Sequence, residues 1–546
     1  MLDTNQANYK MKIFIYNKYF PTCGGGEKHI GGIAEVLAKK HQITILHAGE
    51  LDTSKVSARL NLDLSNILFV SLGHSPNMDF DVLEYVNLHE PDVFINATYF
   101  SLLLAPVKKS ISLIFFPKYF RIEPLHLKDK LKFRLGNFLF RNYTSTIRFH
   151  EGFENEEYVH STTGRWSSEK STLLINKPFS KVDIFFNNLT NTIINDRIRE
   201  ITIHENKLNF EIHHNKIRIK FNSPNACGIH MKFNTFIPYE LNRENSDSRK
   251  LGIFVTTVYT DALDYFSKLL VLLWNLPLLR NKISRFYNTW QTLTHHYYYL
   301  EFLKKNQNIM NSKYTSDWTE RIYGFKHINK KILYPPVDIH IFKPAKAKKK
   351  SIISVGRFFV GGHNKKQVEL INAFRKLYDT APEAREYTLH LCGGTHPETI
   401  HQNYLALCEN LSQGYPIVIH KNIELAELID LYGEAKIFWH AAGMNENEHL
   451  HPDKFEHFGI TTVEAMASGC VPVVLGLAGQ KEIVSHMKTG LLWKTEEELL
   501  QNTLMLINDN SFCNELAEQS VLSSKKYSRT VFNQNVETLF NEILLN

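Results

Sequence analysis

The chain has little cysteine and no cysteine pairing pattern. Only six of its 546 residues are cysteine, and no two stand at the Cys-x-x-Cys spacing. That spacing is typical of structural zinc sites and redox motifs, so we expect neither, and we expect free thiols packed in a reducing cytosol. The first ten residues are polar, which predicts no secretion leader and a cytoplasmic protein.

Long apolar runs and a strong charge bias are also missing. The longest apolar run, residues 269–279, is interrupted by Asn275 and Pro277 and is shorter than the roughly 20 residues that a membrane-spanning helix needs. The net charge of +7 is small for this length, which argues against a nucleic-acid-binding protein. Hydrophobic residues make up 43% of the chain and charged residues 22%, as in folded globular proteins.

Hydrophobic patterning predicts two α/β domains and one all-β segment. Short apolar runs alternate with helical periodicity in residues 11–150 and again in residues 338–546. Runs that are apolar on both faces are typical of a parallel sheet covered by helices on both sides. Between residues 151 and 256 the pattern changes to short alternating strands with Asn-rich turns, which predicts an inserted antiparallel β-sandwich. Residues 257–337 would complete the first domain and its linker.

The strongest chemical signal lies at residues 456–474. Glu456 and Glu464 flank seven residues, within a short helix pattern that ends at Gly469. Glycosidase carboxylates sit about 5–10 Å apart, whereas eight helical steps would separate these two by about 12 Å. We therefore predict separate roles: Glu464 accepts hydrogen bonds from ribose hydroxyls, and Glu456 faces a sugar. The alternative is a pair of solvated glutamates, which the surrounding pattern disfavours.

The residues just before Glu464 predict an anion site. The first N–H groups of a helix have no partner within the helix, and the helix dipole is positive at that end. The backbone N–H groups of Phe458, Gly459 and Ile460 are therefore expected to bind the diphosphate of a nucleotide.

This segment resembles the E-x7-E signature of retaining glycosyltransferases of family 4 (group 1), which have the GT-B fold of two Rossmann-like domains. Two further motifs agree. Residues 356–374 are similar to the family's Gly-Arg…Lys…Ala-Phe pattern, and residues 24–29 resemble its N-terminal glycine loop. The resemblance covers roughly residues 11–150 and 300–500. It implies two Rossmann-like domains that carry the inserted β-sandwich.

The resemblance also implies the chemistry. A nucleotide sugar would lose a nucleoside diphosphate, and Arg357 and Lys365 would stabilise the negative charge that grows on the phosphate. No metal and no cofactor is then expected. By its spacing to Phe374, Lys365 takes the family's lysine position, and Lys366 is the fallback.

The glycine loop and one histidine are further donor-site candidates. Gly25 and Gly26 would let the backbone approach a phosphate or an acceptor closely. His440 falls where the family often has a residue near the donor. Many relatives carry a histidine where this chain has Phe115, and phenylalanine cannot bind a sugar hydroxyl. A metal site is the lesser alternative for four histidines that lie close in sequence, His440, His449, His451 and His457.

Two regions leave alternatives open. Residues 125–143 are basic and amphipathic, and with residues 269–279 they predict either contact with a membrane surface or a helix that packs on the core. The β insertion is either a carbohydrate-binding or acceptor-orienting module, or a structural spacer.

The expected function is hexose transfer, with mannose as the narrow expectation. The donor would be a GDP- or UDP-linked sugar, and the acceptor a saccharide or lipid-linked saccharide in surface polysaccharide or lipopolysaccharide synthesis. The alternative is a sugar-binding protein on a scaffold that has lost turnover. A Rossmann oxidoreductase is disfavoured, because the sequence has no G-x-G-x-x-G motif with an acidic residue about 20 positions later.

Overall fold

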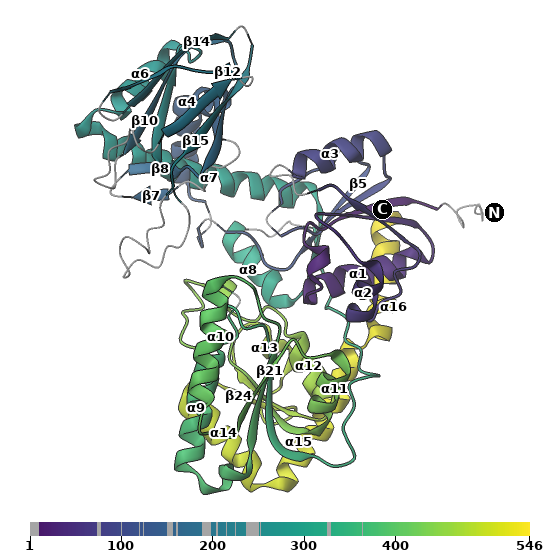
Figure 1. The fold of residues 1–546 in the computed structure, drawn as a ribbon. Helices are drawn as coiled ribbons and strands as arrows, with labels where there is room; N and C mark the ends of the chain where they lie inside the picture. The colour runs from purple at the N-terminus through teal and green to yellow at the C-terminus, as the bar shows by residue number, and fades with distance from the viewer. Residues whose placement is uncertain are drawn as a thin grey trace, which may run out of the picture. The chain divides into compact units, whose positions relative to one another are not determined.

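The chain divides into two compact units in its computed structural model (Figure 1). Unit 1 combines Met1–Pro124 with Tyr299–Asn546, and unit 2 is Leu125–Tyr298. The structure describes residues 10–73, 78–99, 101–119, 121–123, 125–149, 157–159, 162–187, 198–203, 206–213, 216–223, 225–235, 251, 253–324, 329–362 and 364–545.

The first domain of unit 1 is built on a seven-stranded parallel sheet in the order β18-β17-β5-β4-β1-β2-β3. Successive residues of β1 enter different cores: Ile13 and Ile15 pack with α1, α2 and α16, and Phe14 and Tyr16 pack with α3. Both faces of the sheet are therefore covered, which explains the unbroken apolar runs. The bounds are β1 Lys12–Tyr16, β2 Gln42–His47, β3 Ile67–Ser71, β4 Val93–Asn96, β5 Lys109–Ile114, β17 Gln307–Met310, β18 Lys330–Ile332, α1 Gly25–Ala38, α2 Thr53–Leu60, α3 Met78–His89, α8 Lys313–Tyr323 and α16 Arg529–Leu545.

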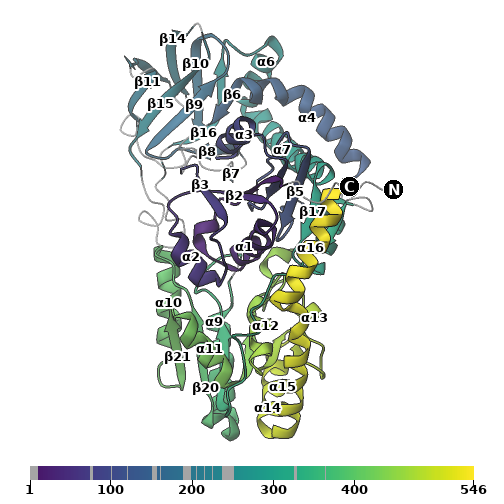
Figure 2. The same ribbon diagram turned by 90° about the vertical axis from the view of Figure 1, so that its right-hand side faces the viewer.

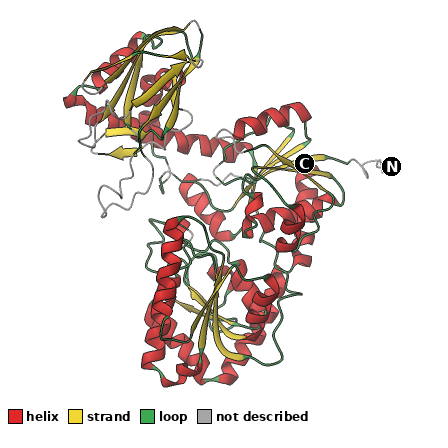
Figure 3. Ribbon diagram, viewed as in Figure 1, coloured by secondary structure: helices red, strands yellow, loops and turns green. Residues whose placement is uncertain are grey.

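The second domain of unit 1 is built on a six-stranded parallel sheet in the order β21-β20-β19-β22-β23-β24, with helices on both sides (Figure 3). Ile352 of β19 packs with α9, α10 and α14, and the next residue, Ile353, packs with α11, α12 and α13. The bounds are β19 Lys349–Val355, β20 Thr388–Gly393, β21 Ile417–Lys421, β22 Ala435–His440, β23 Val471–Leu475, β24 Leu491–Trp493, α9 Gln367–Thr380, α10 Thr399–Ser412, α11 Leu425–Glu434, α12 Ile460–Ala467, α13 Gln480–Ile483, α14 Glu496–Asn508 and α15 Asn510–Ser524.

Unit 2 contains two antiparallel sheets, ordered β13-β14-β10-β16-β8-β7 and β12-β11-β15-β9-β6. They share one apolar core, to which alternate residues of several strands contribute, as Ile217 and Ile219 do in β14. The Asn-rich stretch 188–197 lies outside the described residues. The strands are β6 Ile147–Phe149, β7 Glu157–Val159, β8 Thr162–Trp166, β9 Lys170–Ile175, β10 Phe179–Asn187, β11 Ile198–Ile203, β12 Asn206–Lys207, β13 Phe210–His213, β14 Lys216–Ser223, β15 Cys227–Phe233 and β16 Phe254–Thr260.

Among its described residues, unit 2 also has the helices α4 Leu127–Thr146 and α6 Tyr265–Trp274 and most of α7 Pro277–Lys305, whose residues from Tyr299 onward belong to unit 1 (Figure 2). An aromatic core that includes Phe140, Trp274 and Trp290 joins them. The compact unit is therefore longer at both ends than the predicted insertion of residues 151–256. From their helical periodicity, these helices were predicted to belong to the first domain.

The predicted fold class is confirmed: two parallel, Rossmann-like α/β domains with an inserted antiparallel β-sandwich. The apolar stretch 269–279 divides between two environments, because Leu270 and Trp274 are buried whereas Leu269 and Leu272 are exposed. Among the described helices, none is both long and apolar enough to cross a membrane.

Candidate donor-binding site

The candidate residues of the second domain gather at the carboxyl ends of β19 and β22. These two strands are neighbours, and the strand order reverses between them. Ligands of open parallel sheets bind at such a switch point. Arg357 follows β19 after one glycine, and His440 is the last residue of β22.

The loop that carries Arg357 is held by a buried amide. Gln367, the first residue of α9, donates hydrogen bonds of 3.0 Å to the carbonyl oxygens of both Gly356 and Arg357. The guanidinium lies over the ring of Phe359, with 5.7 Å to the centroid. Arg357 is exposed and has no salt-bridge partner within the described part of the chain. Its charge is therefore available to an anion.

Lys365, Glu456 and His440 form one charged network. The Lys365 ammonium donates to Glu456 Oε2, and His440 Nε2 lies 2.9 Å from the same oxygen. Burial opposes ionisation of Glu456, but Lys365 and His440 outweigh it and hold the pKa of this carboxyl well below its usual range. Burial lowers the pKa of His440 despite the nearby carboxylate. His440 donates through Nε2, because the ionised carboxylate of Glu456 can only accept a hydrogen bond.

The structure separates the two neighbouring lysines. The side chain of Lys365 crosses Gly356, where an added Cβ would lie 2.5 Å from Lys365 Cγ. Lys366 instead pairs with Glu446 at 3.1 Å and with Glu369 at 3.5 Å. The lysine that reaches Glu456 is therefore Lys365 and not the fallback.

Helix α12 begins at Ile460, after Gly459 as its N-terminal cap. Gly459 has φ 111°, and a Cβ there would lie 2.8 Å from Gln480 Nε2. Both the backbone angle and the short distance to Gln480 therefore favour glycine at this position. Gln480 is 1% exposed, and neither polar atom of its side chain has a hydrogen-bond partner among the described residues. This amide was not predicted from the sequence, because it carries no charge and belongs to a different helix, α13.

Glu464 lies in the second turn of α12 and is 8% exposed. Burial raises its pKa to about 7, against a usual value near 4.5, although Lys28 of α1 opposes the shift. Lys28 itself forms a 2.9 Å ion pair with Asp338. The Tyr432 hydroxyl lies 3.5 Å from Glu464 Oε2. Glu464 thus titrates near neutrality.

The glycine loop of the first domain meets the second domain at α12. A Cβ on Gly25 would lie 3.1 Å from Ile460 Cδ1, and one on Gly26 would lie 3.5 Å from the ring of Phe115. Glu27 caps α1 by accepting a 2.8 Å hydrogen bond from the Gly24 N–H. Burial raises the pKa of Glu27, and hydrogen bonds from the backbone and from Thr22, with a smaller effect of the Arg357 charge, partly offset that rise. The three sequence motifs therefore approach one another within unit 1.

Three of the four histidines weighed for a metal contact separate partners. His440 contacts Glu456, His449 Nδ1 lies 3.2 Å from Arg321, and the ring of His457 stacks on Phe116 at 4.2 Å.

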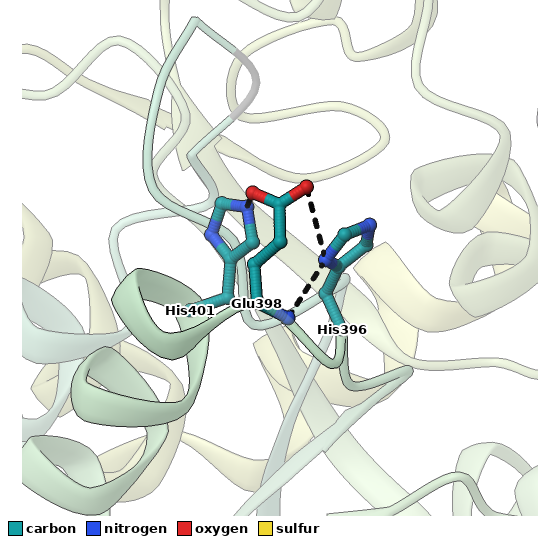
Figure 4. Close-up of side chains that lie close together, drawn as sticks. All are labelled: His396, Glu398 and His401. Carbon is teal, nitrogen blue, oxygen red and sulfur yellow. Dashed lines mark hydrogen bonds and ion pairs between the residues drawn. The ribbon is translucent and has the colours of Figure 1, made fainter. Parts of the chain in front are cut away.

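Another group, His396, Glu398 and His401, is compact enough for a metal, with candidate ligand atoms within 4.8 Å of one another (Figure 4). However, the Val360 N–H donates to His401 Nδ1 at 3.1 Å. The proton of the neutral ring is then on Nε2, which lies 3.6 Å from Glu398 and cannot ligate. We describe this group as a hydrogen-bonded cluster.

Comparison with known proteins finds a family match in the second domain. Residues 337–521 match the family model described as Glycosyl transferases group 1. The chain is 27% identical over 234 residues to a GDP-Man:Man(3)GlcNAc(2)-PP-Dol alpha-1,2-mannosyltransferase of Dictyostelium discoideum, which is 39% of this chain and 43% of that protein. It is 25% identical over 265 residues to the Alpha-1,3/1,6-mannosyltransferase ALG2 of Candida glabrata, covering 43% of this chain and 53% of that one. The chain spans about half the length of the curated relatives it matches.

Solved structures agree on the fold. A glycosyltransferase from Rickettsia africae aligns over 98% of this chain and 100% of its own, with a TM-score of 0.52 and 12% identity. Anabaena Alr3699/HepE, solved in complex with UDP-glucose, aligns over 97% of this chain and 100% of its own, also with a TM-score of 0.52 and 12% identity. At this identity the likeness concerns the fold alone, which is GT-B.

Proposed function

We propose that this chain is a group 1 glycosyltransferase, the family whose model residues 337–521 match, and that it transfers a hexose from a nucleotide sugar to a saccharide acceptor. One observation carries the proposal. Arg357, the Lys365–Glu456 pair and the start of α12 all lie at the switch point of the second sheet. They supply two cations and a helix N-terminus, which together suit a diphosphate.

Each group has a definite role in this proposal. The N–H groups of Phe458, Gly459 and Ile460 bind the diphosphate, and Glu464 binds the ribose hydroxyls. Arg357 and Lys365 neutralise the charge that develops on the leaving phosphate. Family resemblance adds retention of anomeric configuration by attack from the same face, with no protein nucleophile.

In this proposal, binding of the donor changes the partner of Lys365. An incoming diphosphate competes with the carboxylate for the ammonium of Lys365. Glu456 then keeps its contact with His440 and can accept a hydrogen bond from a sugar hydroxyl. In this scheme His440 positions Glu456, since it is 2% exposed and reaches the carboxylate through Nε2.

We further propose mannose as the sugar and a lipid-linked saccharide as the acceptor. The support is the names of the relatives, which are mannosyltransferases, one of them acting on a dolichyl-diphosphate saccharide. Surface polysaccharide or lipopolysaccharide synthesis stays a prediction of the sequence.

Unit 2 has a surface that suits a membrane, where a lipid-linked acceptor would reside. Apolar side chains on α4, spaced three or four residues apart, are 51–73% exposed, and the ring of Phe138 among them lies 5.1 Å from that of Phe266 on α6. Exposed lysines and an arginine alternate with them. Anionic lipid is the partner that fits, because acyl chains take up the apolar groups and head groups attract the cations. The α4 residues are Leu127, Leu131, Leu135 and Phe138, with Lys128, Lys130, Lys132 and Arg134.

Isothermal titration with GDP, UDP, GDP-mannose and UDP-glucose, each with and without a chelator, tests the donor proposal. We expect one nucleotide series to bind, with no effect of the chelator. Failure of all four ligands to bind would refute the proposal. Incubation with the bound nucleotide sugar and a saccharide acceptor then separates an enzyme from a sugar-binding protein, because only the enzyme releases nucleoside diphosphate as glycoside forms.

Sedimentation with vesicles tests the membrane proposal. We expect binding to vesicles that contain phosphatidylglycerol, weaker binding at high salt and little binding to phosphatidylcholine. Leu131→Ser with Leu135→Ser should abolish it. Equal binding by this variant would refute the assignment of the surface.

A further inference from the structure

We propose that unit 2 contains a second ligand site, a cavity that binds an anionic saccharide, meaning a sugar or short glycan bearing a phosphate or a carboxylate. The cavity has a volume of about 560 Å³, within the range typical of small-molecule sites. It lies between α4, α7, β6 and β8, all of them elements of unit 2. The proposal rests on the proposed function only in expecting a saccharide.

The floor of the cavity is rigid. Tyr287 and Trp290 of α7 line it and are 6% and 4% exposed. The Trp290 indole donates a 3.1 Å hydrogen bond to Asn137 Oδ1 of α4. The two helices can approach this closely because residue 136 is glycine: a Cβ there would lie 2.1 Å from Trp290 Cδ1. The packing of α4 against α7 therefore holds these lining residues in place before any ligand binds.

Among the described residues that line the cavity, three are arginines. Arg141 of α4, Arg148 of β6 and Arg165 of β8 line it, and no aspartate or glutamate is among its described lining residues. Neither Arg141 nor Arg148 has a salt-bridge partner in the described portion of unit 2. Arg165 lies over the ring of Phe149, with 5.5 Å from the guanidinium to the centroid. Three arginines from three elements favour phosphate or carboxylate, which a guanidinium binds with two parallel hydrogen bonds.

The remaining lining groups favour a sugar over a bare anion. Side chains that carry hydroxyl and amide groups line the cavity, among them Thr144, Asn137 and Gln291. Tyr298 is 62% exposed at the cavity, so it offers an aromatic face beside these polar groups. Hydroxyl, amide and aromatic groups around a cationic centre match a sugar ring that bears one charged substituent.

Calorimetric titration of the full chain at about 50 mM salt tests the proposal, with mannose 6-phosphate, glucuronate, mannose and inorganic phosphate as probes. At least one of the two anionic sugars should bind about tenfold more tightly than mannose and inorganic phosphate do. A preference for mannose 6-phosphate or for glucuronate identifies the anion as phosphate or carboxylate. Equal binding of inorganic phosphate would overturn the assignment to a saccharide.

Charge-matched variants locate the site. Arg141→Gln with Arg148→Gln should weaken binding of the anionic sugar at least tenfold, whereas Lys130→Gln with Lys132→Gln, the same charge change at exposed positions outside the cavity, should leave it unchanged. An equal loss of affinity in both variants would mean that net charge alone causes the effect, and it would overturn the proposal. Arg357→Ala should keep the binding, so that a failure of the donor site and a failure of this cavity are distinguishable.

Discussion

Glu464 should make nucleotide binding depend on pH in a way that glutamine at the same position abolishes. The carboxylate form is the one that accepts hydrogen bonds from both ribose hydroxyls. With a pKa of about 7, only about one molecule in eleven carries that form at pH 6, about half at pH 7 and nearly all at pH 8. The apparent Kd rises by the inverse of the competent fraction, so we expect it to be about tenfold higher at pH 6 than at pH 8.

The assay is calorimetric titration of GDP or UDP at pH 6, 7 and 8 on the native protein and on Glu464→Gln. The diphosphate itself also gains a proton near pH 6, and the variant controls for this because its donor site sees the same diphosphate. At pH 8 the variant should bind roughly tenfold more weakly, since hydrogen bonds to a charged group contribute about 1.5–3 kcal/mol. A ratio of the two Kd values that stays constant from pH 6 to pH 8 would refute the reasoning.

The free energy of unfolding provides a second readout of this pKa. It should fall as the pH rises, whereas nucleotide affinity should increase. The pKa of Glu464 is higher in the folded protein than its usual value, so the folded state binds the proton more tightly. The resulting stabilisation is complete below about pH 4.5 and is lost as the pH rises through 7, a change of about 3 kcal/mol. Thermal unfolding of the native protein relative to Glu464→Gln should show this loss between pH 5 and pH 8.

Four other substitutions test three separate parts of the structure. Lys365→Ala and Arg357→Ala should each lower the rate of sugar transfer about 100-fold or more with less than a tenfold rise in donor KM, and an equal loss in both parameters would contradict a role in the transition state. Gly459→Ala places a side chain on a residue with φ 111°, which strains the start of α12. The affinity for nucleoside diphosphate should then fall about tenfold, and the affinity for the nucleoside should change less. Competitive titration measures both affinities. Gly136→Ala places a methyl group 2.1 Å from Trp290 Cδ1 and should destabilise unit 2 by about 2–4 kcal/mol, seen as faster amide exchange in α4 and α7 with nucleotide binding unchanged.

The fold followed from the sequence where apolar runs were continuous. Strands such as β1 and β23 are buried on both faces, and their composition alone predicts a covered parallel sheet. The limits of unit 2 did not follow, because α4 and α7 have ordinary helical periodicity. Only the packing of Phe140 against Trp290 shows which unit they belong to.

The donor site was predictable to the extent that its residues are charged or stand in motifs. Arg357, Lys365 and Glu456 could be named in advance, but the ion pair between the last two could not, because it joins positions 91 residues apart. Gln367 and Gln480 were missed. Each acts through a buried amide, and a glutamine in a sequence gives no sign of whether its side chain will be buried.

The path of the chain has a consequence for synthesis. Strand β5 ends at Ile114, yet its neighbour β17 begins only at Gln307, after all of unit 2. During translation, therefore, β5 emerges as an open sheet edge, while unit 2 is contiguous and can complete its core before that edge is covered. A ribosome stalled between these two strands would carry an exposed, aggregation-prone edge, which gives nascent-chain chaperones a defined window in which to act.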